Sequence, residues 1–577
     1  MKKLAIIKKE KCNPGACSRE CEKFCPINKK GEKCVVIENK ARIDEGLCIG
    51  CSICERRCPL NAINIINLPS LDEKKLIHRY GKNGFALYGL PLPRENSVVG
   101  LLGKNGIGKS SAVKILSKQE KMNLGKEEVS NEDIINFFKG SEFLNYFKEL
   151  ENKKIGYKPQ NLSFLAVNLK VKELLLKIAD ENKVKEISKK LNAEQLLEKD
   201  LNTLSGGELQ KIAIIATCLK EADIYFFDEP LAYLDIEERL RVAEFIKEIS
   251  FNKRVVVVEH DLLIMDYLTE YINIFYGKES CYGVVSGIKS TSYGINSYLE
   301  GFLKEENVRI RDKSLNFNLN KIEQAAGHEI ASWPSFKKSF NENFSLEVKE
   351  GKIKTNHLYG IIGKNGTGKT TFVKCLAGLE EVDINGEKKK LDLKLDISYK
   401  PQYLFSDSEE LVREVVFREK INKRLVTDFS LENIYTKKIK ELSGGELQRL
   451  SIARCLSKNA DIYLIDEPSA YLDVEERIEV AKIIKDFMLE NEKICFVVDH
   501  DLLLISYLAD SILVFSGERG KFGKLEGVFS FKEGISLLLK ELGITLRKDK
   551  ESGRPKINKK DSYLDREQKE KNEWVVF

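Results

Sequence analysis

Residues 100–111 read GLLGKNGIGKSS, and residues 360–371 read GIIGKNGTGKTT. Both fit the pattern G-x-x-x-x-G-K-[ST], in which glycines let main-chain N–H groups turn toward phosphate oxygens. The apolar runs before the loops, at 97–102 and 358–362, predict buried strands, and the runs after them predict helices. A helix N-terminus adds partial positive charge for an anion. The two stretches therefore predict two α/β nucleotide-binding domains in one chain.

The chain repeats itself beyond these loops. The repeated pairs are YKPQ (157–160 and 399–402), LSGGELQ (204–210 and 442–448), IYFFDEP with IYLIDEP (224–230 and 462–468), AYLD (232–235 and 470–473) and EHDLL with DHDLL (259–263 and 499–503). The loops are offset by 260 residues and the later pairs by 238 to 242, so the first copy carries about 18 extra residues after its loop. A domain-sized period indicates a tandem duplication.

A pair of carboxylates follows a second apolar run in each copy. The runs IYFF and IYLI read as fully buried parallel strands. Asp228 and Asp466 end these strands and would hold the Mg²⁺ shell. Glu229 and Glu467 come next, where a carboxylate would polarise the attacking water as a general base. The alternative is that these acidic residues merely cap the ends of the strands. The presence of a glycine loop in each copy disfavours it.

Nine of the 14 cysteines lie between Cys12 and Cys58. Clustering without a secretory signal favours metal over disulfides. The second group, C-x2-C-x2-C-x3-C-P, is the bacterial ferredoxin run, in which three thiolates bind one cubane and the fourth binds the other. Applied to both groups, this rule predicts two [4Fe–4S] clusters, one held by Cys12, Cys17, Cys21 and Cys58 and the other by Cys25, Cys48, Cys51 and Cys54.

Zinc is the alternative metal, because four-cysteine zinc sites also use C-x2-C pairs, but triplets followed by C-P favour iron–sulfur. Cys34 is surplus and is interpreted as a small buried thiol. Two clusters suit electron transfer, yet a metal core can also simply hold a small domain together.

The charge distribution favours an anionic partner. The net charge is +6, with a local +7 over residues 1–80 and +3 over residues 547–577. Basic ends suit nucleic acid, and a solvated lysine-rich surface is the alternative. No apolar run approaches the 18 residues of a membrane span, and the first residues lack a signal peptide. We therefore expect a cytoplasmic protein with no membrane partner.

LSGGELQ resembles the signature motif of ATP-binding-cassette (ABC) ATPases. The resemblance implies that the signature of one nucleotide domain binds the γ-phosphate held by the P-loop of the other. It also implies a Mg²⁺-sensing glutamine, a switch histidine and a seam aspartate. These fall on Gln160 and Gln402, His260 and His500, and Asp235 and Asp473.

The expected nucleotide residues form two composite sites. One joins Gly103, Asn105, Gly106, Gly108, Lys109, Ser110, Ser111, Gln160, Asp228, Glu229 and His260 to Ser443, Gly444 and Gly445. The other joins Gly363, Asn365, Gly366, Gly368, Lys369, Thr370, Thr371, Gln402, Asp466, Glu467 and His500 to Ser205, Gly206 and Gly207. Mg²⁺ would be held by Ser110, Gln160 and Asp228, and by Thr370, Gln402 and Asp466. For adenine stacking, which the family places upstream of the loop, the candidates are Tyr80, Phe85 and Trp333, with core packing as the alternative.

The combination with two cluster motifs closely resembles the E subfamily of ABC proteins, the RNase L inhibitor or ribosome-recycling ATPases of archaea and eukaryotes. The matching stretches are CIGCSICERRCP (48–59), INLP (66–69), HRYG (78–81), LPLPR (90–94) and GRPKIN (553–558). The resemblance implies an ATPase that splits ribosomes after termination or rescue, moving its iron–sulfur domain when ATP closes the nucleotide domains. It implies the ribosome and a release-factor-like protein as partners, structural clusters, and ATP and Mg²⁺ as cofactors.

The expected fold is α/β, with two tandem ABC-type nucleotide-binding domains behind a ferredoxin-like domain holding two [4Fe–4S] clusters. The expected domains are 1–75 (iron–sulfur), 76–300 (nucleotide domain 1), 301–325 (hinge), 326–540 (nucleotide domain 2) and 541–577 (second hinge and tail). Residues 126–150 predict a helix–loop–helix insertion, which the family uses on ribosomal RNA, with Lys139 and Ser141 at its tip. We expect the tail to dock through Pro555, Ile557, Tyr563 and Leu564, and the chain to be a monomer.

Three other functions compete with ribosome splitting. A soluble tandem ABC factor of the F subfamily would need a long charged linker and no cluster motifs. A transporter ATPase pair would need a membrane partner, and an ATP-gated electron carrier would need redox-active clusters. A role elsewhere in translation, in initiation with initiation factors or in ribosome biogenesis, is the nearest alternative.

Overall fold

The computed structural model describes residues 2–68, 76–165, 167–315, 327–340, 344–402 and 407–576. The chain forms two compact units: 1–232 with 245–260 and 268–312, and 233–244 with 261–267 and 313–577. The predicted boundary at 75, residues 316–325 of the predicted hinge and Phe577 lie outside the described residues. Among the described residues, no helix combines the length and apolarity that crossing a bilayer requires.

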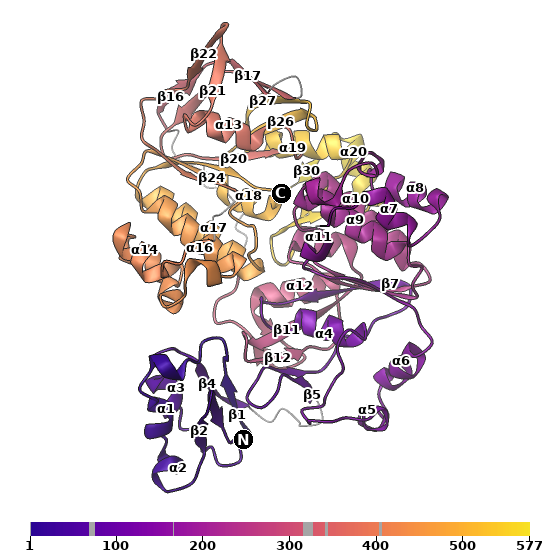
Figure 1. The fold of residues 1–577 in the computed structure, drawn as a ribbon. Helices are drawn as coiled ribbons and strands as arrows, with labels where there is room; N and C mark the ends of the chain where they lie inside the picture. Colours follow the sequence, from indigo (N-terminus) through magenta and orange to yellow (C-terminus); the bar gives the residue numbers. More distant parts are fainter. Residues whose placement is uncertain are drawn as a thin grey trace. The chain divides into compact units, whose positions relative to one another are not determined.

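The first unit begins with a small cysteine-rich module. Its elements are β1 (Lys2–Ile7), α1 (Glu20–Lys23), α2 (Pro26–Lys29), β2 (Val35–Ile37), β3 (Ala41–Ile43), α3 (Ile53–Arg57) and β4 (Ile63–Leu68). The strands β1 and β4 pair antiparallel, and β2 pairs with β3. In Figure 1 the short helices lie along one side of these strands. Much of the core consists of cysteines packed with isoleucine, valine and alanine, so the module has little hydrophobic core of its own.

A loop after β5 joins this module to the rest of the unit. Arg79, the last residue of β5 (Leu76–Arg79), forms two hydrogen bonds of 2.9 and 2.6 Å with the Glu45 carboxylate. The buried amide of Asn83 donates to Ala5 O and accepts from Ile43 N, both at 3.0 Å. Asn83 lies at φ 62°, where asparagine is better tolerated than most residues. The loop therefore holds the module by specific polar contacts.

The first nucleotide domain is built on parallel strands. They are β7 (Ser97–Leu102), β8 (Ile155–Lys158), β9 (Ile224–Asp228), β10 (Arg254–Val258) and β11 (Tyr271–Lys278). The strands β12 (Tyr282–Val285) and β13 (Lys289–Ser290) pair antiparallel with β11, and β6 (Ala86–Tyr88) pairs parallel with β12. Every residue of β7 and β9 is buried, and β9 pairs parallel with both β8 and β10. The prediction of a buried parallel strand before Asp228 is confirmed. The helix α4 (Lys109–Leu116) follows the loop.

Further helices complete this domain. They are α5 (Asn131–Phe137), α6 (Glu142–Leu150), α7 (Val171–Leu176), α8 (Glu181–Lys190), α9 (Gly206–Cys218), α10 (Ile236–Ser250), α11 (Leu262–Leu268) and α12 (Thr291–Glu300). The first two occupy the extra residues for which the sequence predicts a helix–loop–helix. Phe138 is buried and stacks on Phe147 at 4.9 Å, so the pair packs through its aromatic faces.

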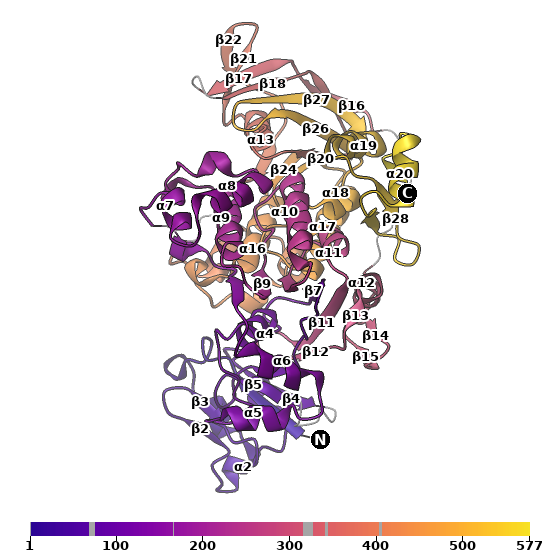
Figure 2. The ribbon, with the colours of Figure 1, turned by 90° about the vertical axis from the view of Figure 1, so that its right-hand side faces the viewer.

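The second unit contains a ten-stranded sheet in the order β22-β21-β17-β18-β27-β26-β20-β25-β24-β23. The strands are β17 (Phe336–Phe340), β18 (Phe344–Val348), β20 (Leu358–Gly363), β21 (Glu381–Ile384), β22 (Glu387–Lys390), β23 (Ile397–Lys400), β24 (Ile462–Asp466), β25 (Ile494–Val498), β26 (Ser511–Glu518) and β27 (Phe522–Ser530). Outside this sheet, β16 (Glu329–Trp333) pairs with β19 (Gly351–Lys354). In Figure 2 the hairpin β21–β22 stands at the far edge of the sheet. The loop strand β20 is central, between β25 and β26.

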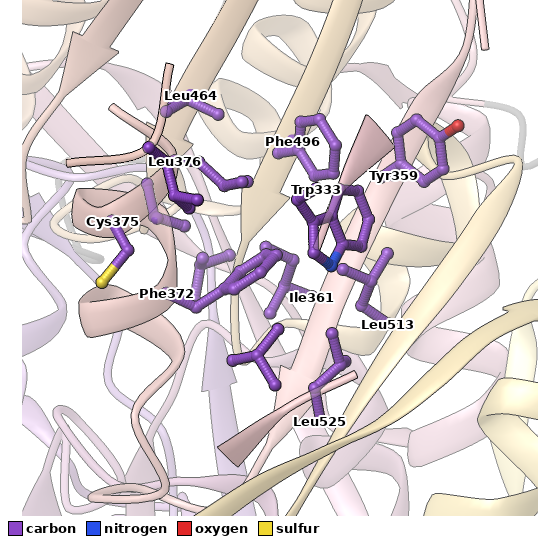
Figure 3. Packing of buried hydrophobic residues seen from close by; sticks show 14 of the residues in the cluster. Trp333, Tyr359, Ile361, Phe372, Cys375, Leu376, Leu464, Phe496, Leu513 and Leu525 are labelled. Carbon is purple, nitrogen blue, oxygen red and sulfur yellow. The ribbon is translucent and has the colours of Figure 1, made fainter. Parts of the chain in front are cut away.

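The core of this domain lies beneath the loop helix. The helices are α13 (Lys369–Leu376), α14 (Val412–Arg418), α15 (Lys423–Asp428), α16 (Gly444–Leu456), α17 (Val474–Glu490), α18 (Leu502–Leu508) and α19 (Phe531–Leu542). Figure 3 shows Phe372 of α13 against Trp333, with Phe496 and Tyr359 beyond it. The Trp333 and Phe372 rings meet edge to face at 5.6 Å. This packing fixes the helix that follows the phosphate loop.

The C-terminal tail folds as a small sheet. Its elements are β28 (Leu546–Lys548), β29 (Pro555–Ile557), α20 (Tyr563–Glu570) and β30 (Val575–Val576). Pro555 and Ile557 are buried, as expected, but Tyr563 is 72% exposed and Leu564 43%, so these two are not anchors. The apolar end of the chain packs instead, because Val575 pairs with Leu546 and is 1% exposed.

Candidate nucleotide sites and cysteine centre

The two glycine loops have the same backbone conformation. Gly103, Gly106 and Gly108 lie at φ 156°, 67° and 99°, and the second loop has 146°, 73° and 91° at its matching glycines. Such angles favour glycine. Lys109 Nζ donates to Gly103 O and to Lys104 O at 2.7 Å. Lys369 Nζ bonds likewise to Gly363 O and Lys364 O at 2.9 and 2.7 Å. Each ammonium is therefore held inside its loop.

The strand-end aspartates offer unsatisfied oxygens beside these loops. Asp228 and Asp466 are 1% and 0% exposed. Oδ1 of Asp228 and both carboxylate oxygens of Asp466 accept no hydrogen bond from the described residues. Burial raises the pKa of Asp466, opposed by the nearby Thr370 hydroxyl and Lys400. Buried acceptors without donors beside a loop hydroxyl suit a divalent cation, so the residues fit Mg²⁺.

A glutamine and a histidine face each candidate base. Gln160 Nε2 donates to Glu229 Oε1 at 2.8 Å, and His260 Nε2 lies 3.4 Å from the same oxygen. Gln402 donates to Glu467 at 2.8 Å, with His500 Nε2 at 3.7 Å. The structure thus brings together, in each copy, three residues that the sequence placed far apart.

The environments of the two glutamates differ. Burial acts to raise the pKa of Glu229, but His260 and Lys109 outweigh it and lower this pKa to about 2. For Glu467, burial and the neighbouring charge of Asp466 raise the pKa. Burial, reinforced by Lys369, lowers the pKa of His500 well below its ordinary value. His500 therefore stays neutral and gives less support to the Glu467 carboxylate.

Each signature motif begins a helix. Ser205 caps α9 and Ser443 caps α16, both through a capping box with the glutamate three residues on. Both serines and the first glycine of each helix, Gly206 and Gly444, are exposed. An exposed helix N-terminus that begins with glycines provides N–H groups for an anion. In the second unit, Asp235 accepts a hydrogen bond from Asn365 N at 2.8 Å.

The aromatic candidates for adenine divide into two groups. Tyr80 donates to Glu120 at 2.7 Å and lies 3.0 Å from Ser111 Oγ. A Cβ on Gly108 would come within 2.8 Å of the Phe85 ring. Both therefore border the first loop. Trp333 does not face the second loop: it is 1% exposed, and its Nε1 donates to Lys349 O. The prediction for Trp333 is wrong, because its ring completes the core.

Sequence reasoning missed the residues that take this place in the second copy. The Phe344 ring lies 3.2 Å from a Cβ built on Gly368, as Phe85 does at Gly108. Phe340 is 40% exposed, and its centroid is 6.4 Å from that of Phe344, the separation between Tyr80 and Phe85. The signal was an aromatic pair separated by a short polar run, YGKNGF and FNENF, upstream of each loop.

The cysteines gather as the ferredoxin rule predicts. One cavity is lined by Cys25, Cys48, Cys51 and Cys54, the four predicted ligands of one cluster, and by Cys34. Burial and the neighbouring Cys48 raise the pKa of Cys54 to about 12. Burial, with Cys58, Cys12 and Cys17 close by, raises the pKa of Cys21 to about 11. The second predicted set is therefore also in one place.

This arrangement suits clusters better than single ions. A cubane spreads its four thiolates over four irons, whereas zinc draws them around one centre. The residues therefore fit [4Fe–4S] groups. Their chemistry here would be to crosslink a module with little apolar core, and binding would release the thiol protons.

The helix–loop–helix presents an exposed tip. Lys139, Gly140 and Ser141 are all exposed, and Ser141 Oγ donates to Phe138 O at 2.7 Å. Gly140 lies at φ 81°, which makes the tight turn. The two predicted contact residues lie together on this turn.

Family models match most of these regions. The ABC transporter model matches residues 93–232 and 342–470. A model described as a possible Fer4-like domain in RNase L inhibitor matches residues 3–33, and the 4Fe–4S binding domain model matches residues 41–64.

Individual relatives match over the whole chain. An uncharacterised ABC transporter ATP-binding protein of Methanocaldococcus jannaschii is 45% identical over 99% of this chain and 97% of its own. The translation initiation factor RLI1 of Saccharomyces cerevisiae is 41% identical over 98% and 97%. A solved structure described as a model of ribosome-bound archaeal Pelota and ABCE1 gives a TM-score of 0.93, with 43% identity and 99% of both chains covered. A complex of archaeal ribosomal stalk protein aP1 with the recycling factor aABCE1 gives 0.83 and 43%, covering 88% of this chain and all of the other.

Proposed function

Because the chain belongs to the E family of ABC proteins, the RNase L inhibitor family, we propose that it is an ATP-driven ribosome-recycling factor. It is an ATPase with two ABC domains and a 4Fe–4S-type N-terminal region. The observation that carries the proposal is the presence of two complete Gln–Glu–His sets behind a cysteine-rich module in one chain. The named relatives, which are a ribosome-bound protein and a recycling factor, supply the target.

The proposed sites are composite. The first loop, with Gln160, Asp228, Glu229 and His260, would bind one ATP whose γ-phosphate meets the helix N-terminus at Ser443. The second loop, with Gln402, Asp466, Glu467 and His500, would meet Ser205. Glu229 and Glu467 would take the proton of the attacking water, while the glutamines orient each carboxylate. Mg²⁺ would be held by Ser110, Gln160 and Asp228, and by Thr370, Gln402 and Asp466, and would offset phosphate charge.

Closure of the two domains on ATP would do the mechanical work. The cysteine module is tied to the loop containing Tyr80 and Phe85 through Arg79 and Asn83, so rearrangement at the first nucleotide would reach the module. The exposed turn at Lys139 and Ser141 is the proposed contact with ribosomal RNA, where a cation meets phosphate. A release-factor-like protein is the proposed co-partner, and the protein is proposed to act as a monomer in the cytoplasm.

Subunit separation on a sucrose gradient tests this function. Intact ribosomes are mixed with anaerobically prepared protein, a release-factor-like partner and ATP. We expect free subunits with the native chain and intact ribosomes with Glu229→Gln plus Glu467→Gln under multiple-turnover conditions. Persistence of intact ribosomes while ATP is consumed normally would reject splitting. An alternative role in initiation would then predict stable binding to the small subunit alone.

A further inference from the structure

A lysine in each copy is buried directly beneath the carboxylate motif. Lys158 is the last residue of β8 and Lys400 the last residue of β23, and they are 0% and 1% exposed. Both strands pair in parallel with the strand that ends in the aspartate. Lysine is rarely buried without a partner. The same residue at the same place in both copies therefore needs an explanation.

The partners of these lysines are main-chain carbonyls. Lys158 Nζ donates to Asp228 O and Glu229 O, both at 2.9 Å. Lys400 Nζ donates to Asp466 O at 2.7 Å and Glu467 O at 3.3 Å. One ammonium thus bridges two consecutive peptide units, those that carry the proposed Mg²⁺ ligand and the proposed base. Hydrogen bonds from a charged donor are the stronger kind.

The glutamates held in this way are strained. Glu229 lies at φ 47° and Glu467 at φ 48°, in the left-handed region. A non-glycine residue persists there only when the surroundings over-determine it. A second donor acts on the same carbonyl, because Gln210 Nε2 donates to Glu229 O at 3.3 Å and Gln448 to Glu467 O at 2.5 Å. The main chain of each glutamate is therefore held from two sides.

The segment Lys158–Gln160 contacts Glu229 at two points. Lys158 holds its carbonyl, and Gln160, two residues on, holds its carboxylate oxygen at 2.8 Å. Pro159 between them has a fixed φ, so the spacing of the two contacts is rigid. The second copy repeats this arrangement. A neutral core residue would avoid the cost of burying an ammonium, and burial indeed lowers the pKa of Lys158 to about 8.

We propose that Lys158 and Lys400 are positioning residues for hydrolysis, which hold Glu229 and Glu467 in the strained turn from which their carboxylates face glutamine and histidine. This inference rests on the proposed role of the two glutamates as bases. Both lysines are buried, and they act through the main chain of the aspartate that ends the strand and of the glutamate that follows it.

The test compares the paired variant Lys158→Met plus Lys400→Met with the native full-length protein. We expect kcat for phosphate release to fall about a hundredfold, because a small displacement of a reacting group has an effect of that size. The KM for ATP and the Kd of a fluorescent ATP analogue should change less than about threefold. The matched control is Lys289→Met, which removes another buried lysine, paired with Glu305 and Glu306, and should leave kcat within about twofold.

A double-mutant comparison separates positioning from general damage. In the Glu229→Gln plus Glu467→Gln background, the lysine substitutions should cause no further loss, since the groups they position are already gone. An equal further loss there, or a kcat within about threefold of native, would overturn the inference. If the methionine pair does not fold, Lys158→Met and Lys400→Met are made singly, each with the base of the other site replaced by glutamine, and are judged by the same criteria. If Glu229→Gln plus Glu467→Gln itself leaves hydrolysis unchanged, the proposed function of the glutamates fails instead.

Discussion

Gln160 Nε2 and Glu229 Oε1 are 2.8 Å apart, and Gln402 and Glu467 repeat that distance in the second copy. An amide that donates to one carboxylate oxygen fixes which oxygen faces the water. The histidine contact differs, because His260 Nε2 lies 3.4 Å from its glutamate oxygen and His500 Nε2 lies 3.7 Å from its own. The two sites therefore share the glutamine contact and differ at the histidine.

Replacing the shared contact should slow hydrolysis in both sites. For Gln160→Ala and Gln402→Ala, made singly, we expect the kcat of the affected site to fall about tenfold to a hundredfold with little change in nucleotide affinity. Phosphate release is measured with the opposite base replaced by glutamine, so that one site reports. An unchanged kcat in either single-site background would contradict the role of the glutamine.

The cysteine sets predict distinct effects of single substitutions. In Cys54→Ser, iron content should fall by about half and visible charge-transfer absorbance should drop, because one cubane loses a ligand. Cys34→Ser is the matched control: Cys34 lines the same cavity and is 2% exposed, but it is not in either predicted set. Iron loss in Cys34→Ser equal to that in Cys54→Ser would make Cys34 a ligand.

The aromatic pairs predict where adenine stacks. Tyr80→Ala and Phe340→Ala should each weaken binding of ATP about tenfold at their own site, the loss of one stacked ring. Nucleotide titration with a fluorescent analogue measures this. Phe417→Ala provides the control, since that ring is 72% exposed on α14. Equal weakening by all three variants would exclude stacking as the cause.

Asn83 should hold the cysteine module in place. Asn83→Ala removes two buried hydrogen bonds and leaves alanine at φ 62°, at an expected local cost of about 3 kcal/mol. Hydrogen exchange in β1 should accelerate accordingly, while exchange in β20 stays unchanged. In Asn61→Ala, an exposed asparagine at φ 48° is replaced, and exchange in β1 should hardly change. Equal acceleration in both variants would show that Asn83→Ala acts through backbone strain and not through the lost hydrogen bonds.

Asp499 predicts a pH dependence of stability. Burial, with the nearby charge of Asp501, raises its pKa to about 6, against hydrogen bonds from Ser469 and Asp501 N. A raised pKa means that the folded state binds the proton more tightly than the unfolded state. Stability from this group is therefore greatest below about pH 4 and is lost as pH rises through 6, a change of about 3 kcal/mol.

Thermal unfolding between pH 4 and 8 measures this contribution. The unfolding midpoint of the native protein should fall more steeply with rising pH than the midpoint of Asp499→Asn. A constant difference between the two midpoints does not affect this comparison. Identical slopes for the two proteins would show that Asp499 has an ordinary pKa in the folded state.

The sequence predicted the parts of the sites that depend on local pattern. Glycine spacing identified both loops, and a buried apolar run placed Asp228 and Asp466 at strand ends. Cysteine spacing predicted four of the five thiols that line one cavity. Contacts across the sheet could not be predicted, because no local sequence pattern links Lys158 to the carbonyl of Glu229, seventy-one residues away. The prediction that Trp333 stacks on adenine was wrong, because proximity to the loop in sequence does not determine which side of the sheet a ring faces.

The strand β30 supplies the second partner of Leu546 and Arg547, which pair with β29 on their other side. A chain is synthesised from its N-terminus, so β28 and β29 emerge before the residues that complete their sheet. Both partners of β28 lie after it in the sequence. The tail sheet can therefore close only after Val575 and Val576 have been made.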